Sequence, residues 1–128
     1  MEIPDTLKYT REHEWARTKG TQVVIGITDF AQDHLGDVVF VELPDVGDTV
    51  KKGESFGVVE STKAVSELFA PVSGKVVEVN DPLGDTPETI NDDPYEEGWM
   101  IVVEPSDPKE LDALMDAKAY RAFVEEQE

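Results

Sequence analysis

The chain contains no cysteine, only two histidines and no long apolar run. Without cysteine it forms no disulfide and offers no thiolate to a zinc ion or to a Cys-His pair. His13 and His34 alone give a nucleophilic relay little to work with. No apolar run approaches the roughly 20 residues that a membrane-spanning helix needs. These absences exclude thiolate metal centres and argue against membrane insertion.

Glycine-rich phosphate loops and calcium loops are also missing. Asp92 and Asp93 lack the ordered carboxylate spacing of a calcium loop. We interpret His13, beside Trp15, as a hydrogen-bonded structural histidine. The sequence therefore predicts no metal site and no catalytic residues, and hence no enzyme activity of the chain on its own.

Positive charge is scarce: 11 Lys and Arg residues face 29 Asp and Glu residues, and the net charge is −18. Such a chain repels nucleic-acid phosphates but suits basic protein partners. The N-terminal stretch shows neither the apolar core of a signal peptide nor an Arg-rich transit pattern, and the lack of cysteine fits a reducing compartment. We expect a cytoplasmic protein, or a matrix protein that has lost its presequence, which binds neither nucleic acid nor membrane.

The length of 128 residues and the mass of 14.2 kDa fit one domain over residues 1–128 with a core that needs no disulfides. Gln22 to Ile27 alternates as a strand does, and we expect Tyr9 to Ala16 to supply its partner strand. A short helix is predicted over Asp29 to Leu35, capped by Thr28 or Asp29 and ended by Gly36.

A helical tail is predicted over about 106–125, capped by Ser106 or Asp107. Its apolar side chains recur at helical spacing and should pack on the sheet: Leu111, Leu114, Met115, Tyr120, Phe123 and Val124. The last four residues, Glu125 to Glu128, are expected to fray.

The middle of the chain repeats itself. The segment 36–41, GDVVFV, recurs as GKVVEV at 74–79, and Pro44 recurs as Pro82. Gly47-Asp48-Thr49 recurs as Gly84-Asp85-Thr86, and Val58-Val59-Glu60 as Val102-Val103-Glu104. Two copies are too few for a solenoid. We predict a mostly β fold with helices, in which two quasi-symmetric halves, about 36–60 and 74–104, pack as a flattened β-barrel or sandwich, a barrel-sandwich hybrid.

A single lysine stands where a hairpin should turn, within the segment VVESTKAVSE at 58–67. Strand alternation allows Val58 and Val65 to anchor the two arms while Lys63 projects into water. Taken alone, such a lysine is more often an ordinary solvated side chain. Its place between matched strands favours an exposed lysine that serves as an attachment site.

Short segments along nearly the whole chain together resemble the lipoyl-carrying H proteins of the glycine cleavage system, within the biotinyl/lipoyl carrier fold. The segments are Tyr9, His13-Glu14-Trp15, Gly26-Ile27-Thr28-Asp29, Ala31-Gln32, Leu35-Gly36, Val41-Glu42-Leu43-Pro44, Gly57-Val58-Val59-Glu60-Ser61, Lys63-Ala64, Ala70-Pro71-Val72-Ser73-Gly74, Val77-Glu78-Val79-Asn80, Pro94-Tyr95 and Gly98-Trp99. One departure is Thr62, where the family more often has valine, and a turn tolerates either.

The resemblance implies that Lys63 carries lipoate through an amide, within an attachment turn of Glu60, Ser61, Thr62 and Ala64. It implies a shuttle that takes the aminomethyl group of glycine from a PLP-dependent glycine decarboxylase to a folate-dependent aminomethyltransferase. A flavin-dependent dihydrolipoyl dehydrogenase then reoxidises the arm. Lipoate-attaching enzymes are the fourth class of partner. A carrier that visits several enzymes is expected to be a monomer.

The aminomethyl cargo needs protection, because a neutral amine can expel the thiolate. Nearby carboxylates keep the amine protonated by raising its pKa. Glu14 is the first candidate for this role, followed by Glu67 and Glu12. Each is otherwise an ordinary surface carboxylate.

Three other functions stay open. A lipoyl domain of a 2-oxoacid dehydrogenase acyltransferase shares the lysine hairpin but lacks counterparts of the segment 9–36 and of the helical tail. A biotin carrier would flank its lysine with methionines, where Thr62 and Ala64 stand here. An unmodified interaction module, or a lipoate relay to other complexes, is the third.

Overall fold

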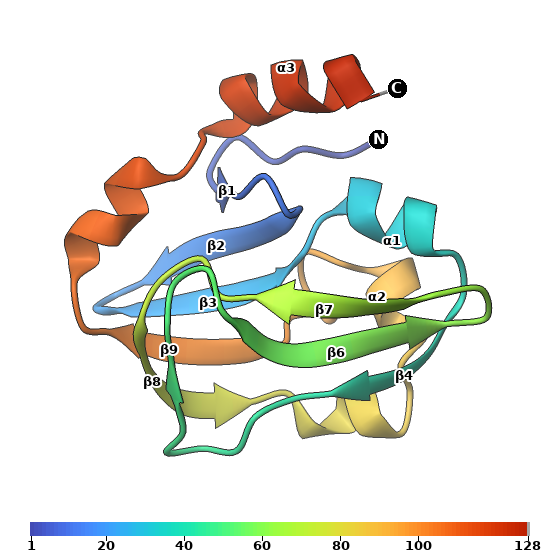
Figure 1. Cartoon of the computed structure of the whole chain (residues 1–128), viewed down its shortest axis with the longest axis horizontal. Coiled ribbons are helices and arrows are strands. Elements are labelled where there is room, and N and C mark those ends of the chain that lie inside the picture. Colours follow the sequence, from blue (N-terminus) through green and yellow to red (C-terminus); the bar gives the residue numbers. More distant parts are fainter. Residues whose placement is uncertain (128) are drawn as a thin grey trace.

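The computed structural model describes residues 1–127, which form two antiparallel sheets packed face to face with helices around them (Figure 1). The elements are β1 (Lys8–Tyr9), β2 (Glu14–Lys19), β3 (Gln22–Ile27), α1 (Asp29–Leu35), β4 (Val38–Glu42), β5 (Thr49–Val50), β6 (Ser55–Ser61), β7 (Val65–Phe69), β8 (Gly74–Val79), the 3₁₀ helix η1 (Asp81–Gly84), α2 (Thr89–Asp92), β9 (Ile101–Pro105), the 3₁₀ helix η2 (Pro108–Ala113) and α3 (Ala117–Gln127).

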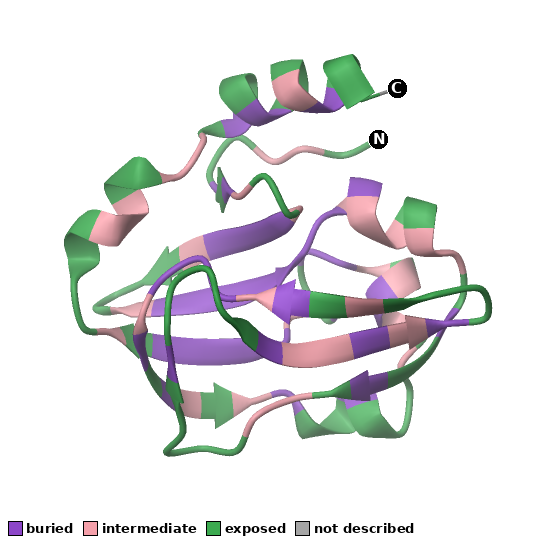
Figure 2. Ribbon diagram, viewed as in Figure 1, coloured by how far each residue is buried: buried purple, intermediate pink, exposed green. Residues whose placement is uncertain are grey.

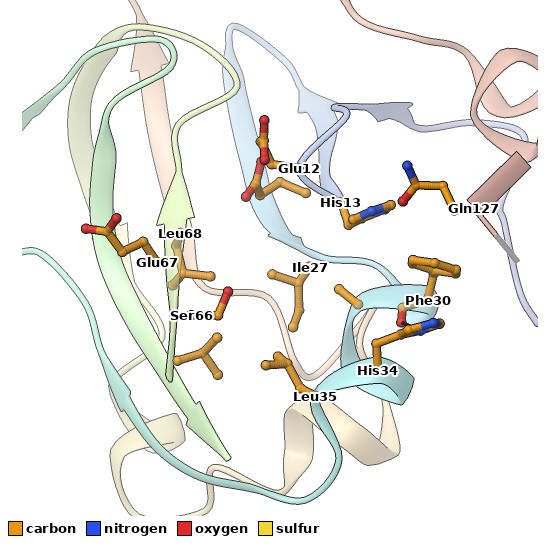
Figure 3. A pocket seen from close by; sticks show the side chains of 13 residues that line it. Glu12, His13, Ile27, Phe30, His34, Leu35, Ser66, Glu67, Leu68 and Gln127 are labelled. Atoms are coloured by element: carbon orange, nitrogen blue, oxygen red, sulfur yellow. Dashed lines mark hydrogen bonds between the residues drawn. The ribbon is translucent and has the colours of Figure 1, made fainter. Parts of the chain in front are cut away.

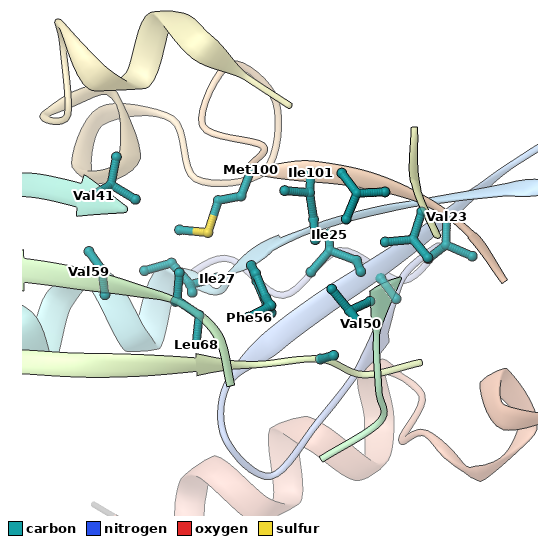
Figure 4. Packing of buried hydrophobic residues seen from close by; sticks show 14 of the residues in the cluster. Val23, Ile25, Ile27, Val41, Val50, Phe56, Val59, Leu68, Met100 and Ile101 are labelled. Atoms are coloured by element: carbon teal, nitrogen blue, oxygen red, sulfur yellow. The ribbon is translucent and has the colours of Figure 1, made fainter. Parts of the chain in front are cut away.

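The larger sheet has the strand order β1-β2-β3-β9-β8-β5, and the smaller sheet has the order β4-β6-β7. Buried side chains from both sheets fill the space between them, including Val23 and Ile25 on β3, Val59 on β6 and Leu68 on β7 (Figure 4). Figure 2 shows the buried stretches of the ribbon in purple. The predicted mostly β sandwich with a short helix and C-terminal helices is confirmed.

Strand β3 is buried on both faces. Val23, Ile25 and Ile27 point into the core between the sheets, as their alternation predicts. Val24 lies on the opposite face and joins a second apolar cluster, in which Trp15 and Tyr120 are also buried. The second cluster forms because α3 and the N-terminal segment cover that side of the larger sheet.

Three strand pairs show a one-residue register shift; one lies in the β6–β7 pairing between Ser55 and Gly57, and the other two lie in the repeated segments. The β4–β6 pairing shifts register between Val38 and Phe40, and the β8–β9 pairing shifts between Val76 and Glu78. Both shifts are one-residue bulges. They lie 38 residues apart, as the sequence copies do.

The third matched segment of the repeat is out of register with this structural correspondence. Val41 is the second residue after the bulge in β4, and it pairs with Val59. Val79 is the second residue after the bulge in β8, and it pairs with Ile101. Val59 therefore corresponds to Ile101 and not to Val103, so the Val-Val-Glu match is displaced by two residues. A two-residue displacement keeps every side chain on its original face, which explains why the match looks valid in sequence.

The strand expected over Tyr9 to Ala16 is interrupted. β1 ends at Tyr9 and β2 begins at Glu14, and the turn between them has His13 at a φ of 71°. This left-handed conformation lets the Thr10 amide donate to the Glu14 carbonyl oxygen at 3.0 Å. The expectation of one continuous strand was wrong because no glycine or proline marks the turn.

The helical tail is divided into two parts. Asp107 caps η2 as predicted, but the chain then becomes extended, and Met115 and Tyr9 exchange two backbone hydrogen bonds of 2.8 and 2.9 Å. The predicted helical spacing through Leu114 and Met115 is therefore wrong. α3 continues to Gln127, so Glu125 to Gln127 are helical where fraying was expected, and Glu128 lies outside the described residues.

Within the part of the chain that the structure describes, no helix is both long enough and apolar enough to cross a bilayer.

Candidate functional site

Lys63 lies at the tip of the β6–β7 hairpin, exposed to solvent. The turn closes through the Ser61 amide, which donates to the Ala64 carbonyl oxygen at 2.8 Å. The Ser61 hydroxyl oxygen accepts from the amides of Lys63 at 3.3 Å and Ala64 at 3.1 Å. Because Ser61 is itself buried, it fixes the turn while Thr62, Lys63 and Ala64 stay exposed.

The tip also leans on the end of α1. The Thr62 amide donates to the Asp37 carbonyl oxygen at 3.0 Å, and a Cβ placed on Gly36 would lie 3.3 Å from Lys63 Cε. The Asn91 amide group on α2 donates to the Gly36 carbonyl oxygen at 2.8 Å. The aliphatic part of the Lys63 side chain therefore passes over Gly36, whose backbone is held in place by Asn91.

The two valines expected to anchor the hairpin behave differently. Val58 is half-buried, but Val65 is 65% exposed, so the expectation for Val65 was wrong. Val65 faces outward opposite Glu60, which is half-buried on the outer surface of the small sheet. The buried anchors are Val59 and Leu68, which point toward the larger sheet.

Beside the hairpin, α1 and β7 enclose a cleft of about 370 Å³ (Figure 3). Its walls mix apolar and polar side chains, and its carboxylates lie on the strand side. The lining residues are Glu12, His13, Glu14, Ile27, Phe30, Ala31, His34, Leu35, Val59, Ser66, Glu67, Leu68 and Gln127. Leu35 directly precedes Gly36, so the cleft begins where the lysine stem passes. All three carboxylates proposed from the sequence line it.

Glu14 is the buried one, with 2% of its surface exposed. One carboxylate oxygen accepts from the Thr10 hydroxyl at 2.6 Å, and the other accepts from the Phe69 amide at 3.2 Å. Burial raises the pKa of Glu14 from 4.5 to about 7, although both hydrogen bonds oppose the shift. A cation entering the cleft would meet a carboxyl that is poised to ionise beside it.

Glu12 and Glu67 are both exposed. Figure 3 shows the Glu67 side chain directed away from the cleft interior, whereas its neighbour Ser66 points inward. Strand alternation explains this, since Ser66 shares its face with buried Val59 and Glu67 does not. Geometry therefore ranks Glu14 above the other two carboxylates.

The sequence and structure are similar to those of a named group of carriers. The family model described as "Glycine cleavage H-protein" matches residues 7–127. The glycine cleavage system H protein of Anaeromyxobacter sp. (strain K) is 82% identical over 128 residues, which is all of both chains. The chain belongs to the glycine cleavage H-protein family.

Other members of the family agree with this assignment. The glycine cleavage system H protein of Myxococcus xanthus (strain DK1622) is 64% identical over 123 residues, which cover 96% of this chain and 95% of that protein. The crystal structure of a glycine cleavage system H protein from Mycobacterium marinum matches with a TM-score of 0.87 at 47% identity, covering 94% of this chain and 97% of that one. The resemblance stated from the sequence motifs is confirmed.

Several cleft residues of this family member went unnoticed in the sequence. Phe30, His34 and Leu35 line the cleft from α1, and the helical periodicity of that segment offered the only signal for them. Gln127 reaches the cleft from the far end of the chain. Nothing in the local sequence shows that α3 returns to this side of the molecule.

Proposed function

We propose that this H-protein family member carries the aminomethyl group of glycine on lipoate joined through an amide to Lys63. The observation that carries the proposal is one juxtaposition: an exposed lysine on a hydrogen-bonded turn stands beside a cleft that contains a buried carboxyl. Membership of the family indicates the carrier role in glycine cleavage. Lys63 and Glu14 are the residues to which we assign the chemistry of that role.

The residues present fit a lipoyl group. Ser61 and the Asp37 carbonyl hold the turn, so Lys63 is presented to an attaching enzyme without local unfolding. The apolar side chains that line the cleft, among them Ile27, Leu35 and Leu68, suit a hydrocarbon arm. When bound, lipoamide supplies the disulfide that accepts the cargo and is later reoxidised.

Glu14 is the residue that we assign to the cargo nitrogen. A carboxylate beside an amine favours its ammonium form, and an ammonium has no lone pair with which to expel the thiolate. The same ammonium lowers the pKa of the Glu14 carboxyl, so the pair ionises together. The Glu14 carboxyl is itself buried, and an ion pair in such surroundings is less weakened by water than one at the surface.

The proposed partners follow from the cycle. The turn must be recognised by the PLP-dependent glycine decarboxylase, the folate-dependent aminomethyltransferase, the dihydrolipoyl dehydrogenase and a lipoate-attaching enzyme. Thr62, Lys63 and Ala64 are exposed at the hairpin end, and Figure 1 shows the terminal segments leaving the sheets elsewhere. Basic surfaces on these partners would complement the net charge of −18.

The experiment is the rate at which the loaded carrier releases formaldehyde when no transferase is present. Glu14→Ala should leave lipoylation and loading intact and accelerate release, because the ammonium loses its buried partner. Glu12→Ala and Glu67→Ala are the matched controls, and loss of these exposed carboxylates should change the rate by a small, salt-dependent factor. Equal release from Glu14→Ala and wild type would remove the role of Glu14. Failure of the lipoylated wild type to accept a group from the decarboxylase would remove the carrier function itself.

A further inference from the structure

The hydroxyl of Tyr120 joins two walls of the cleft although α3, which carries it, lies on the far side of the larger sheet from the core. It is 2.8 Å from His13 Nδ1 and 2.7 Å from Thr28 Oγ1. Tyr120 is fully buried, and its ring stacks on that of Tyr9 at a centroid distance of 4.5 Å. A buried hydroxyl with two partners in fixed positions has little freedom to reorient.

Thr28 and His13, the two partners of the Tyr120 hydroxyl, each lie at the start of a segment that lines the cleft. Thr28 caps α1 by accepting from the Ala31 amide at 3.2 Å, and α1 forms the helical wall of the cleft. His13 precedes Glu14, and its carbonyl oxygen accepts from the Thr28 amide at 3.0 Å. The two walls therefore meet at the Tyr120 hydroxyl and at this backbone bond.

His13 needs such an anchor because its backbone is unusual. It is the one non-glycine residue among residues 1–127 with a positive φ, 71°, which an unrestrained histidine seldom adopts. Its ring packs 4.5 Å from Phe30 and 5.7 Å from Phe123 between centroids. The ring is thus held on its faces by aromatic contacts and at its edge by Tyr120.

The turn that ends at His13 determines where the Glu14 side chain points. The Glu14 amide donates to the Thr10 hydroxyl at 3.1 Å, and that hydroxyl donates to the Glu14 carboxylate at 2.6 Å. When neutral His13 carries its proton on Nε2, its Nδ1 accepts a hydrogen bond from the Tyr120 hydroxyl. The Tyr120 hydroxyl then accepts from the Thr28 hydroxyl, which accepts from the Ala31 amide. Each hydroxyl in this chain both donates and accepts.

We infer that Tyr120 is a positioning residue: its hydroxyl fixes the His13 turn and the Thr28 cap, and so holds the Glu14 carboxyl and helix α1 at their places in the cleft. This inference rests on the proposed function for its effect on cargo, but the positioning itself is testable without cargo. It gives helix α3 a second part in the site, besides the Gln127 side chain that lines the cleft.

The test compares Tyr120→Phe with Tyr9→Phe. Both variants remove one hydroxyl from the same stacked pair, but the Tyr9 hydroxyl donates only to the Pro4 carbonyl oxygen, at 2.6 Å. Hydrogen exchange should accelerate about two- to tenfold at the Phe69 and Ala31 amides in Tyr120→Phe, relative to the Val76 amide in β8. In Tyr9→Phe these ratios should stay at the wild-type value.

Formaldehyde release from the loaded, lipoylated Tyr120→Phe carrier should accelerate by a similar factor. Unchanged exchange ratios in Tyr120→Phe would overturn the inference, whatever the release rate. If exchange accelerates but Glu14→Ala does not alter release, positioning stands and the protective role of Glu14 falls. Should Tyr120→Phe fail to fold, Thr28→Val and Thr28→Ser replace it: only the valine should accelerate exchange at Phe69, and equal exchange in the two would overturn the inference.

Discussion

The Glu14 carboxylate accepts a hydrogen bond of 3.2 Å from the Phe69 amide, which joins β2 of the larger sheet to β7 of the smaller one. The bond places a carboxyl at the junction of the two sheets, inside the cleft beside the lysine hairpin. Burial at this junction gives Glu14 its raised pKa. Glu14 therefore links the two sheets through a hydrogen bond and also supplies the cleft with a carboxyl of raised pKa.

The first prediction is that Glu14 makes stability depend on pH. Its pKa rises from 4.5 to about 7 on folding, so the folded state favours the protonated form. The contribution to stability is complete below about pH 4.5 and is lost as the pH rises through about 7. Glu14→Gln should therefore be more stable than wild type at pH 8, by up to about 3 kcal/mol, and the difference should fade toward pH 5.

Denaturant unfolding at pH 5 and pH 8 measures this difference. Glu12→Gln serves as the control, because that exposed carboxyl should change the free energy of unfolding by less than about 0.5 kcal/mol at either pH. A Glu14→Gln effect that is the same at both pH values would show that the carboxyl ionises normally.

The second prediction concerns Lys63→Arg. The exposed side chain is exchanged for another cation, so the free energy of unfolding should change by no more than about 0.5 kcal/mol. Glycine cleavage by the reconstituted system should nonetheless be abolished, because arginine cannot form the amide. Lys51→Arg, another exposed lysine, should retain activity, and turnover by Lys63→Arg would contradict the carrier role.

The third prediction tests the packing behind the cleft. A Cβ on Gly26 would lie 2.6 Å from Trp15 Cζ2, and the indole has little room to move because its Nε1 donates to the Pro94 carbonyl oxygen at 3.0 Å. Gly26→Ala should destabilise the fold by about 1–3 kcal/mol. Gly84→Ala, which meets nothing within 4 Å, should be neutral or slightly stabilising. Equal melting temperatures for the two variants would refute the close approach.

Local patterns predicted the elements whose signals are local. Helix α1 runs from Asp29 to Leu35 with Thr28 as its cap and Gly36 at its end, as expected from capping chemistry. The alternation of β3 and the exposure of the Lys63 turn were also readable. Each of these depends on residues within a few positions of one another.

What the sequence did not show depends on long-range contacts. Helical spacing misled at Met115, because that residue bridges to Tyr9 more than 100 positions away. Val65 looked like an anchor because its alternation could be assigned to either face, and only the pairing with Glu60 decides which one. Three carboxylates were predicted to lie near the cargo, but the burial of Glu14 alone among them, and the contact of Tyr120 with His13, required the fold.

The most direct test of the account is the mass of the Lys63-containing peptide from the native protein. This peptide should carry one lipoyl group in amide linkage, and the other lysines should be bare. A bare Lys63 in protein whose lipoyl group is found on another lysine would contradict it.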